Sequence, residues 1–399
     1  MADRRRTILC MASYFKGERF LKRCKEEGAH TILLTVQSLL GDPWPREAID
    51  EIFGLPSFQD LKGLLHAVSY LCRTRVIDRV VALDDFDVET AAQVREHLRK
   101  PGLGDSAARL FRDKLAMRVR AREIGVRIPD FVGAIHHSEI RDFLARIPAP
   151  WLLKPRSEAS SIGIQKLHKA DDVWKALDQL ADNASFHLIE QMVPGDLYHV
   201  DSLVADNKVM FAQPSRYVRP LLEVYHGGGV YATRTLPSDR AEYKPLVENN
   251  EKLLTGFGLG RGASHTEFMR AHADSQFYFI ETSCRVGGAN TAEMVEAATG
   301  INLWSEWAKL EIDFDKPYQL PQRKSSNAGV VISLAKDEKP DTSSFNDPEI
   351  CYRLNKPQHI GFVLCSDNSM RVDELLRRYS ERISKEHTLV IPAADRHVN

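Results

Sequence analysis

Three side chains capable of chemistry follow the short apolar run Phe277–Ile280: Glu281, Ser283 and Arg285. The run is long enough for a buried strand and too short for a typical helix. In an extended strand alternate side chains share a face, so all three would project together. The pair Gly287–Gly288 would let the backbone approach a ligand closely. This arrangement is typical of phosphate and metal chemistry, although a strand end with a simple ion pair would have the same spacing.

A second carboxylate, Glu267 in the segment His265–Phe268, could come from a neighbouring strand. Mg²⁺ prefers oxygen ligands, keeps several waters and takes further ligands from substrate phosphates. Two carboxylates on adjacent strands, Glu267 and Glu281, would suit that ion. Cys284 should point to the opposite face, and we interpret it as a packing residue rather than a nucleophile.

Two lysines occur earlier in settings that suit an anion. Lys114 recurs with apolar residues at three- and four-residue spacing in a helix predicted over residues 106–124. A buried lysine is costly unless it is paired or meets an anion, but it can also snorkel to solvent, and the pattern leaves both readings open. Lys154 lies on the predicted strand Trp151–Pro155, before the small-residue loop Ser157–Gly163. Such a loop can fold over phosphates with its N–H groups and hydroxyls, or it can be a plain hairpin turn.

Composition and charge argue against several classes of protein. The 399 residues include 43% hydrophobic and 27% charged side chains, which is ordinary for a globular protein of two or three domains. A net charge of −1 indicates no nucleic-acid or membrane surface, and no apolar run approaches the ~18 residues of a membrane span. Six cysteines without C-x-x-C spacing favour reduced thiols and a cytoplasmic location.

The elements that must position these side chains fall into three parts. Residues 1–105 alternate apolar runs with helical patterns and predict a parallel α/β layer. Their first strand-to-helix turn lacks G-x-G-x-x-G, which argues against a dinucleotide site there. Residues 106–313 carry the candidate chemistry, and residues 314–399 predict a small α+β cap. Asp84 and Asp85 end a strand of the first part; they could reach a ligand, although such residues are more often helix caps.

Strands and a long loop precede Glu267. Residues Phe186–Val193 predict a strand, and Leu197–Ala212 predicts a hairpin. His199 and Asp201 share one face of that hairpin, a pair that is more often a structural hydrogen bond than a site. The basic, glycine-rich segment from Arg216 to Arg234 has the length of a functional or mobile loop, and we expect it to face the substrate.

The order of these segments resembles the ATP-grasp superfamily of carboxylate–amine ligases, especially its amino-acid and dipeptide ligases. The resemblance covers roughly residues 80–335. It rests on a colinear set of short motifs: Phe111-Arg112-Asp113-Lys114, Leu153-Lys154-Pro155, Ile189–Gly195, Tyr198–Asp201, His265–Phe268 and Ile280–Gly288. It implies an α/β and α+β fold: an N-terminal Rossmann-like pre-ATP-grasp domain, an ATP-grasp domain with a lid over about residues 128–194 and a central antiparallel sheet, and the small C-terminal α+β cap.

The resemblance also implies roles for individual residues. The residues implied for ATP are Lys114, Lys154, Ser160, Ser161, Gly163, Glu190, Gln191, Met192, Val193 and His199. The implied metal ligands are Glu267, Glu281 and Ser283, and the implied substrate residues are Arg216, Arg234, Arg285, Gly287 and Gly288. Lys154 and Arg285 would be catalytic, with Arg285 stabilising charge on the reacting carboxylate. The backbone of Gln191 and Val193 would read the adenine edge.

Three features depart from the family pattern. Ser283 stands where relatives have Asn or Asp, and a hydroxyl is a weaker metal ligand. The phosphate loop has only Gly163 where relatives often have several glycines. The acidic residue that often binds ribose falls near Leu197, which leaves His199 or Asp201 as substitutes.

The implied function is the ATP-dependent joining of a carboxylate, expected to be that of an amino acid, to an amine. ATP and Mg²⁺ (or Mn²⁺) would be the cofactors, and the partners would be small-molecule carboxylate and amine substrates, with no nucleic acid and no membrane; a homodimer is compatible with this. One alternative is activation of bicarbonate, as in biotin carboxylase. The lack of a linked carrier domain argues against this alternative. Another is a nucleotide-binding protein without turnover. The presence of the lysines, the carboxylates and Arg285 argues against this alternative.

Overall fold

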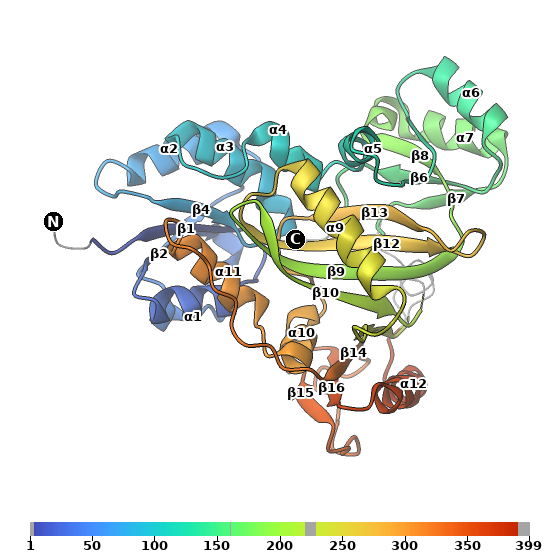
Figure 1. The fold of residues 1–399 in the computed structure, drawn as a ribbon. Helices are drawn as coiled ribbons and strands as arrows, with labels where there is room; N and C mark the ends of the chain where they lie inside the picture. Colours follow the sequence, from blue (N-terminus) through green and yellow to red (C-terminus); the bar gives the residue numbers. More distant parts are fainter. Residues whose placement is uncertain (1–3, 160, 220–228, 390–399) are drawn as a thin grey trace.

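The computed structural model describes residues 4–159, 161–219 and 229–389 (Figure 1). Its N-terminal part is a four-stranded parallel sheet in the order β3-β2-β1-β4. The strands are β1 Thr7–Ala12, β2 His30–Val36, β3 Glu51–Leu55 and β4 Arg79–Ala82, and the helices are α1 Glu18–Glu26, α2 Leu61–Leu71 and α3 Val88–Leu98. All of β1 is buried, as expected for a parallel strand covered on both faces, with α1 on one side and α2 and α3 on the other. The predicted parallel α/β layer is confirmed.

A second, smaller sheet forms a lid with the strand order β5-β8-β6-β7. Its elements are β5 Phe131–Gly133, α6 His137–Arg146, β6 Trp151–Pro155, β7 Gln165–Leu167, α7 Ala170–Leu180 and β8 His187–Gln191. Helices α6 and α7 pack on one face through an apolar core of their own, which includes Phe143, Leu153 and Leu177 (Figure 1). The other face is left to meet the rest of the molecule.

The central sheet has eight strands in the order β13-β12-β9-β10-β11-β14-β16-β15. They are β9 Gly195–Ala205, β10 Lys208–Tyr217, β11 Tyr231–Thr235, β12 Gly262–Ala271, β13 Phe277–Ser283, β14 Asn327–Leu334, β15 Ile350–Arg353 and β16 His359–Ser366. Every pairing in it is antiparallel. Strands from the C-terminal segment therefore extend the same sheet that carries the candidate chemistry.

Helices cover the central sheet according to the alternation of its side chains. Helices α5 Lys114–Glu123 and α9 Tyr243–Phe257 pack on the face that carries Phe268 and Phe279. Helices α10 Thr291–Thr299 and α11 Leu303–Ile312 pack on the opposite face and join the core of the N-terminal sheet. Helix α12 Ser369–Glu386 covers β14 and β16. The N-terminal sheet and the central sheet thus share one continuous apolar core.

The single helix predicted over residues 106–124 is wrong, because the helix is broken. A short helix, α4 Asp105–Ala108, and a 3₁₀ turn at Arg109–Phe111 come first, and α5 begins at Lys114. The Asp113 side chain accepts hydrogen bonds from the N–H groups of Leu115 and Ala116, so it caps a new helix. Lys114 therefore occupies a helix start, not the middle of an apolar stripe.

We retain residues 1–105, 106–313 and 314–399 as the proposed domain division, with the last part supplying β14 to β16 to the central sheet. No helix within the described ranges is both long enough and apolar enough to cross a membrane.

Candidate functional site

Two cavities meet at the β12–β13 edge of the central sheet. The first, which we call the lid cavity, has a volume of about 520 Å³ and lies between the lid sheet and the central sheet. Its walls are largely apolar, with Leu152 and Met192 from the lid opposite Met269 and Ile280 from β12 and β13. A slot of this size, apolar along its walls and charged at one end, fits a flat base followed by phosphates.

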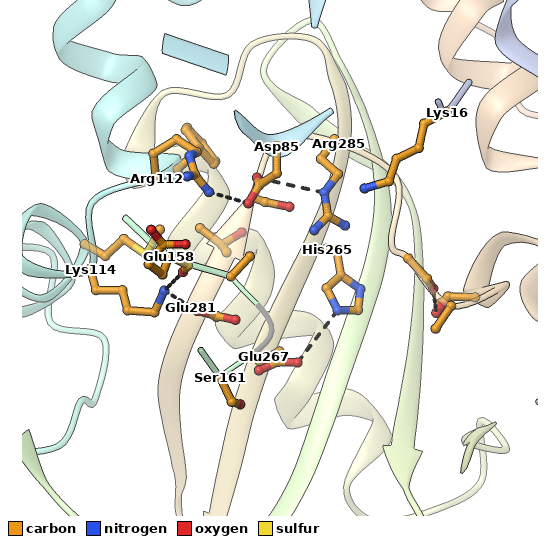
Figure 2. A pocket seen from close by; sticks show the side chains of 18 of the residues that line it. Lys16, Asp85, Arg112, Lys114, Glu158, Ser161, His265, Glu267, Glu281 and Arg285 are labelled. Carbon is orange, nitrogen blue, oxygen red and sulfur yellow. Dashed lines mark hydrogen bonds and ion pairs between the residues drawn. The ribbon is translucent and has the colours of Figure 1, made fainter. Parts of the chain in front are cut away.

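The second, which we call the polar cavity, has a volume of about 290 Å³ (Figure 2). Charged and polar side chains dominate its lining, including Lys16, Asp85, Arg112, Tyr217, His265 and Arg285. The two cavities share Lys114, Glu158, Ser161, Glu267 and Glu281. Two molecules bound in the two cavities would therefore meet beside a lysine and two candidate metal ligands.

The two carboxylates lie where the sequence predicts. Strands β12 and β13 run antiparallel, and Glu267 is the direct cross-strand partner of Glu281, just before a bulge. Such partners have Cβ atoms about 5 Å apart. Ser283 follows on the same face, and its hydroxyl is buried with no hydrogen-bond partner among the described residues. Two carboxylates and an unpartnered hydroxyl oxygen that line one cavity fit Mg²⁺, so the donor set suits the ion the sequence implies.

Lys114 links the α5 start to these carboxylates. Its Nζ lies 2.9 Å from Glu281 Oε2 and donates a hydrogen bond of 2.6 Å to the Glu158 carbonyl oxygen (Figure 2). Burial alone would raise the pKa of Glu281, but Lys114 outweighs it and holds the pKa below its ordinary value. Glu281 is therefore an anion at neutral pH and is available to a metal ion.

Lys154 reaches the lid cavity from β6 and pairs with the Glu190 carboxylate of β8. Glu190 also accepts a hydrogen bond of 2.7 Å from Arg118 Nε of α5, and the Arg118 side chain is completely buried. Burial would raise the pKa of Glu190, but Arg118 and Lys154 together lower it. The Glu190 carboxylate thus holds Lys154 and Arg118 at the wall of the lid cavity, which Glu190 itself lines.

The hinge after β8 contributes unevenly to the lid cavity. Met192 and Val193 line it, whereas Gln191 does not. The N–H of Gln191 donates 2.8 Å to the Asp130 carbonyl oxygen, and that of Met192 donates 3.0 Å to the Pro150 carbonyl oxygen. These two hydrogen bonds fix the hinge backbone. The Gln191 N–H already donates to Asp130 and is therefore not free to donate to an adenine base.

The small-residue loop lies over the meeting point of the two cavities. Ser161 lines both of them with a positive φ of 58°, a conformation that serine seldom adopts. Gly163 has a φ of 70°, and a Cβ there would lie 2.8 Å from Pro155 Cγ, so this glycine is required by the turn rather than by a cavity. Ser160, also predicted to bind ATP, lies outside the described residues.

Three predicted ligand contacts are wrong. The His199 side chain is fully buried, with Nδ1 2.7 Å from Asp201 Oδ2 and Nε2 2.8 Å from Thr233 Oγ1, so it does not reach a nucleotide. The side chains of Arg216 and Arg234 line neither cavity, although they are direct partners on β10 and β11. They project from the opposite face of the sheet, and residues 220–228 of the same segment lie outside the described part.

Both arginines have partners on that far face. Arg216 lies 3.0 Å from Asp196 Oδ1, and Arg234 lies 2.6 Å from Asp373 Oδ1 of α12. These ion pairs account for two arginine side chains on a face of the sheet that lines neither cavity.

Arg285, expected to be a catalytic and substrate residue, lines the polar cavity together with Gly288. Its NH1 donates 2.9 Å to the Val286 carbonyl oxygen, and its Nε lies 3.9 Å from Asp85 Oδ1 (Figure 2). Gly287 has a different role, because a Cβ there would lie 2.8 Å from both Asp201 Oδ1 and His265 Nδ1. The glycine at this position makes room for the Asp201–His265 pair.

Several cavity residues are not among the predicted site residues. Asp84 is a cap, since it accepts a hydrogen bond from Phe86 N–H, and it also pairs with Lys16. Asp85 instead lines the polar cavity and lies 2.5 Å from Arg112 NH1. Asp85 follows the carboxyl end of a parallel strand, where ligands of such sheets bind, so its position in the sequence indicates a place in the site.

His265 faces the polar cavity from β12. Its Nδ1 lies 2.8 Å from Asp201 Oδ1, and its Nε2 lies 3.9 Å from Glu267 Oε1 (Figure 2). Burial would lower the pKa of His265, but Asp201 and Glu267 raise it to about 9. The position two residues before Glu267 on the same strand places the imidazole on the same face.

Cys284 is a packing residue, so replacing it with alanine should leave the chemistry intact. Its side chain contacts two apolar clusters, and burial raises the pKa of the thiol to about 12, which keeps it protonated. We expect Cys284→Ala to change kcat by less than about threefold and to lower the free energy of unfolding by about 1 kcal/mol. Steady-state rates and urea unfolding would check this, and a large loss of rate at unchanged stability would contradict it.

Comparisons with known proteins agree with this geometry. No protein-family model matches the chain. It is 22% identical over 269 residues to an L-arginine-specific L-amino acid ligase of Bacillus subtilis, covering 66% of this chain and 64% of the relative. It is 27% identical over 210 residues to a D-alanine–D-alanine ligase of Dechloromonas aromatica, covering 51% of this chain and 67% of the relative. The chain thus spans about two thirds of the length of each relative.

Solved structures match over nearly the whole chain. An L-amino acid ligase from Bacillus licheniformis superimposes with a TM-score of 0.77 at 19% identity, covering 97% of this chain and 99% of that one. The biotin carboxylase domain of a Hydrogenobacter thermophilus 2-oxoglutarate carboxylase, in complex with MgADP, ADP and bicarbonate, gives a TM-score of 0.70 at 14% identity, covering 95% and 90%. The chain thus has the fold of ATP-grasp enzymes, and in sequence it is similar to amino-acid ligases.

Proposed function

We propose that the chain is an ATP-dependent ligase that joins a carboxylate, that of an amino acid, to an amine. The observation that carries the proposal is the meeting of the two cavities at Glu267 and Glu281. An apolar slot suited to a nucleotide and a polar cavity suited to a zwitterion open onto the same pair of carboxylates. The names of the amino-acid ligase relatives support the same reaction.

The reaction begins with ATP in the lid cavity and a carboxylate in the polar cavity. A carboxylate is a poor electrophile, because its negative charge masks the carbonyl carbon. Its oxygen attacks the γ-phosphorus of ATP, the bond to the β-phosphate oxygen breaks, and an acyl phosphate and ADP result. Such transfers depend on positioning and charge neutralisation more than on covalent catalysis by the protein.

The charged residues of the site suit that task. Lys114 and Lys154 would contact the phosphates, and Glu267, Glu281 and Ser283 would hold Mg²⁺ or Mn²⁺. When bound, the ion would supply Lewis-acid neutralisation of phosphate charge. Arg285 stabilises the charge on the carboxylate and on the acyl phosphate, helped by the backbone at Gly288.

The amine then attacks the acyl carbon, the C–O bond to the phosphate breaks as the C–N bond forms, and the nitrogen loses a proton. The product is an amide, accompanied by ADP and inorganic phosphate. We place the small-molecule amine in the polar cavity, between the N-terminal sheet and Arg285.

The six cysteines, which are all unpaired, support the cytoplasmic location that the sequence favours.

The proposal predicts phosphate release that needs two substrates. Purified protein with Mg-ATP should release phosphate at least about tenfold faster with a carboxylate and an amine than with either alone, because the acyl phosphate turns over only when an amine accepts it. A panel of amino acids, read by phosphate release and by mass spectrometry of the products, would check this. Release driven by bicarbonate and biotin would favour a carboxylase, and no release across the panel would favour a nucleotide-binding protein without turnover.

A further inference from the structure

Tyr217 contacts one of the candidate metal ligands directly. Its hydroxyl donates a hydrogen bond of 2.7 Å to Glu267 Oε1, and both side chains are buried. Tyr217 is the last residue of β10, two strands away from Glu267 on β12, and its ring lines the polar cavity. The hydrogen bond therefore crosses the face of the sheet above β9.

A second contact approaches the same oxygen of Glu267. His265 Nε2 lies 3.9 Å from Oε1 (Figure 2). The imidazole is held in place from behind, because its Nδ1 lies 2.8 Å from Asp201 Oδ1 and Asp201 is itself completely buried. Within the described part of the chain, both polar contacts of the Glu267 carboxylate thus fall on Oε1.

This division leaves Oε2 as the oxygen that can turn to the neighbouring Glu281. A carboxylate rotates readily about its terminal bond, and a hydrogen bond to one oxygen fixes the plane of the group and the direction of the other. Hydrogen bonds to metal-binding carboxylates commonly set both their orientation and the affinity of the site.

We propose that Tyr217 is a positioning residue, which holds Oε1 of Glu267 so that Oε2 alone binds the metal ion. The inference rests on the proposed function, because it needs Glu267 to be a metal ligand. Its consequence is specific to the metal: loss of the hydroxyl weakens metal binding and leaves the nucleotide slot, which Tyr217 does not line, unchanged.

The test is the metal dependence of ADP binding, measured by calorimetry at a series of free Mg²⁺ concentrations, without turnover. In Tyr217→Phe the Mg²⁺ concentration that gives half of the metal-dependent gain in affinity should rise by about 10- to 100-fold. Affinity for ADP in the absence of metal should stay within about threefold of the wild type.

The matched control is Tyr198→Phe, which removes a hydroxyl from the opposite face of the same sheet. Tyr198 is fully buried and its hydroxyl has no hydrogen-bond partner among the described residues. This variant should bind Mg²⁺ and ADP as the wild type does. A shift as large as that of Tyr217→Phe would mean that hydroxyl loss perturbs the sheet in general, and would overturn the assignment.

A double-mutant cycle keeps the inference testable if the single variant loses stability. In a Glu267→Gln background, Tyr217→Phe should have no further effect on the Mg²⁺ midpoint, since the two residues act as one unit. Additive effects would overturn the inference, as would a midpoint in Tyr217→Phe within threefold of the wild type. If the wild type itself binds ADP without any dependence on Mg²⁺, the proposed function fails first, and that outcome is recognisable before any variant is made.

Discussion

Replacing Glu281 with glutamine should slow phosphate release by about 10³-fold while the protein stays folded. The amide has the same size and can still accept a hydrogen bond from Lys114, which lies 2.9 Å away. It removes the negative charge that a metal ion needs and that Lys114 neutralises. Phosphate release with both substrates would measure the loss, and a thermal unfolding curve would show that the fold persists.

The control for this variant is Glu248→Gln on α9. Its side chain is 62% exposed and lies 3.7 Å from Lys244, so its charge is remote from both cavities. We expect wild-type rates from it. If Glu281→Gln also retained a rate within about threefold of the wild type, Glu281 would not be a metal ligand, and the proposed reaction would lose its central residue.

Removing the buried Arg118 guanidinium should be the most destabilising single change at the site. Arg118 donates to Glu190 through Nε at 2.7 Å and approaches it through NH2 at 2.6 Å, and all three groups of the Arg118–Glu190–Lys154 network are buried. Breaking one partner of a buried pair leaves a carboxylate short of its compensating charge, at a cost of about 3–5 kcal/mol. We expect that loss for Arg118→Met in urea unfolding.

The same helix supplies the comparison. Arg120→Met removes a guanidinium that is 42% exposed, pairs with Glu123 at 3.1 Å and donates a hydrogen bond of 2.9 Å to the Gly256 carbonyl oxygen. Such surface pairs contribute about 1 kcal/mol or less. Unlike Arg118→Met, this change leaves no buried carboxylate short of a partner. Equal losses of stability in the two would show that the network around Glu190 contributes no more than an exposed pair.

The parts of the site that follow from strand alternation could be predicted from sequence. Glu281 and Ser283 share a face because they lie two residues apart in β13. Arg285 lies two residues beyond the end of β13 and still lines the polar cavity. Glu267 joins them because its strand pairs antiparallel with the next one along the chain. Lys154 was recognisable in the same way, from its place on a short apolar strand followed by small residues.

The errors arise where a single residue decides the outcome. Arg216 and Arg234 belong to the right strands, but a shift of one residue reverses the face, and it is Tyr217 that points into the cavity. The helix expected across Lys114 breaks because Asp113 caps a new one.

Long-range pairing is the other limit. Glu190 has a hinge position in the sequence, yet its carboxylate is held by Arg118, 72 residues away. Local patterns carry no information about such a partner, since spacing along the chain does not reveal which buried charges meet in the folded protein.

The continuity of the central sheet has a consequence for the size of the smallest folding unit. Among the described residues, all that line the two cavities precede residue 292, so the candidate site lies within the first three quarters of the chain. Yet β11, which carries Tyr231 of the polar cavity, hydrogen-bonds to β14 on its far side, and α12 covers the apolar residues beneath. A chain ending before β14 would leave β11 as an open edge, free to pair with another molecule. The C-terminal strands contribute no side chain to the two cavities, but they cover the sheet edge at β11 and thereby prevent aggregation through it.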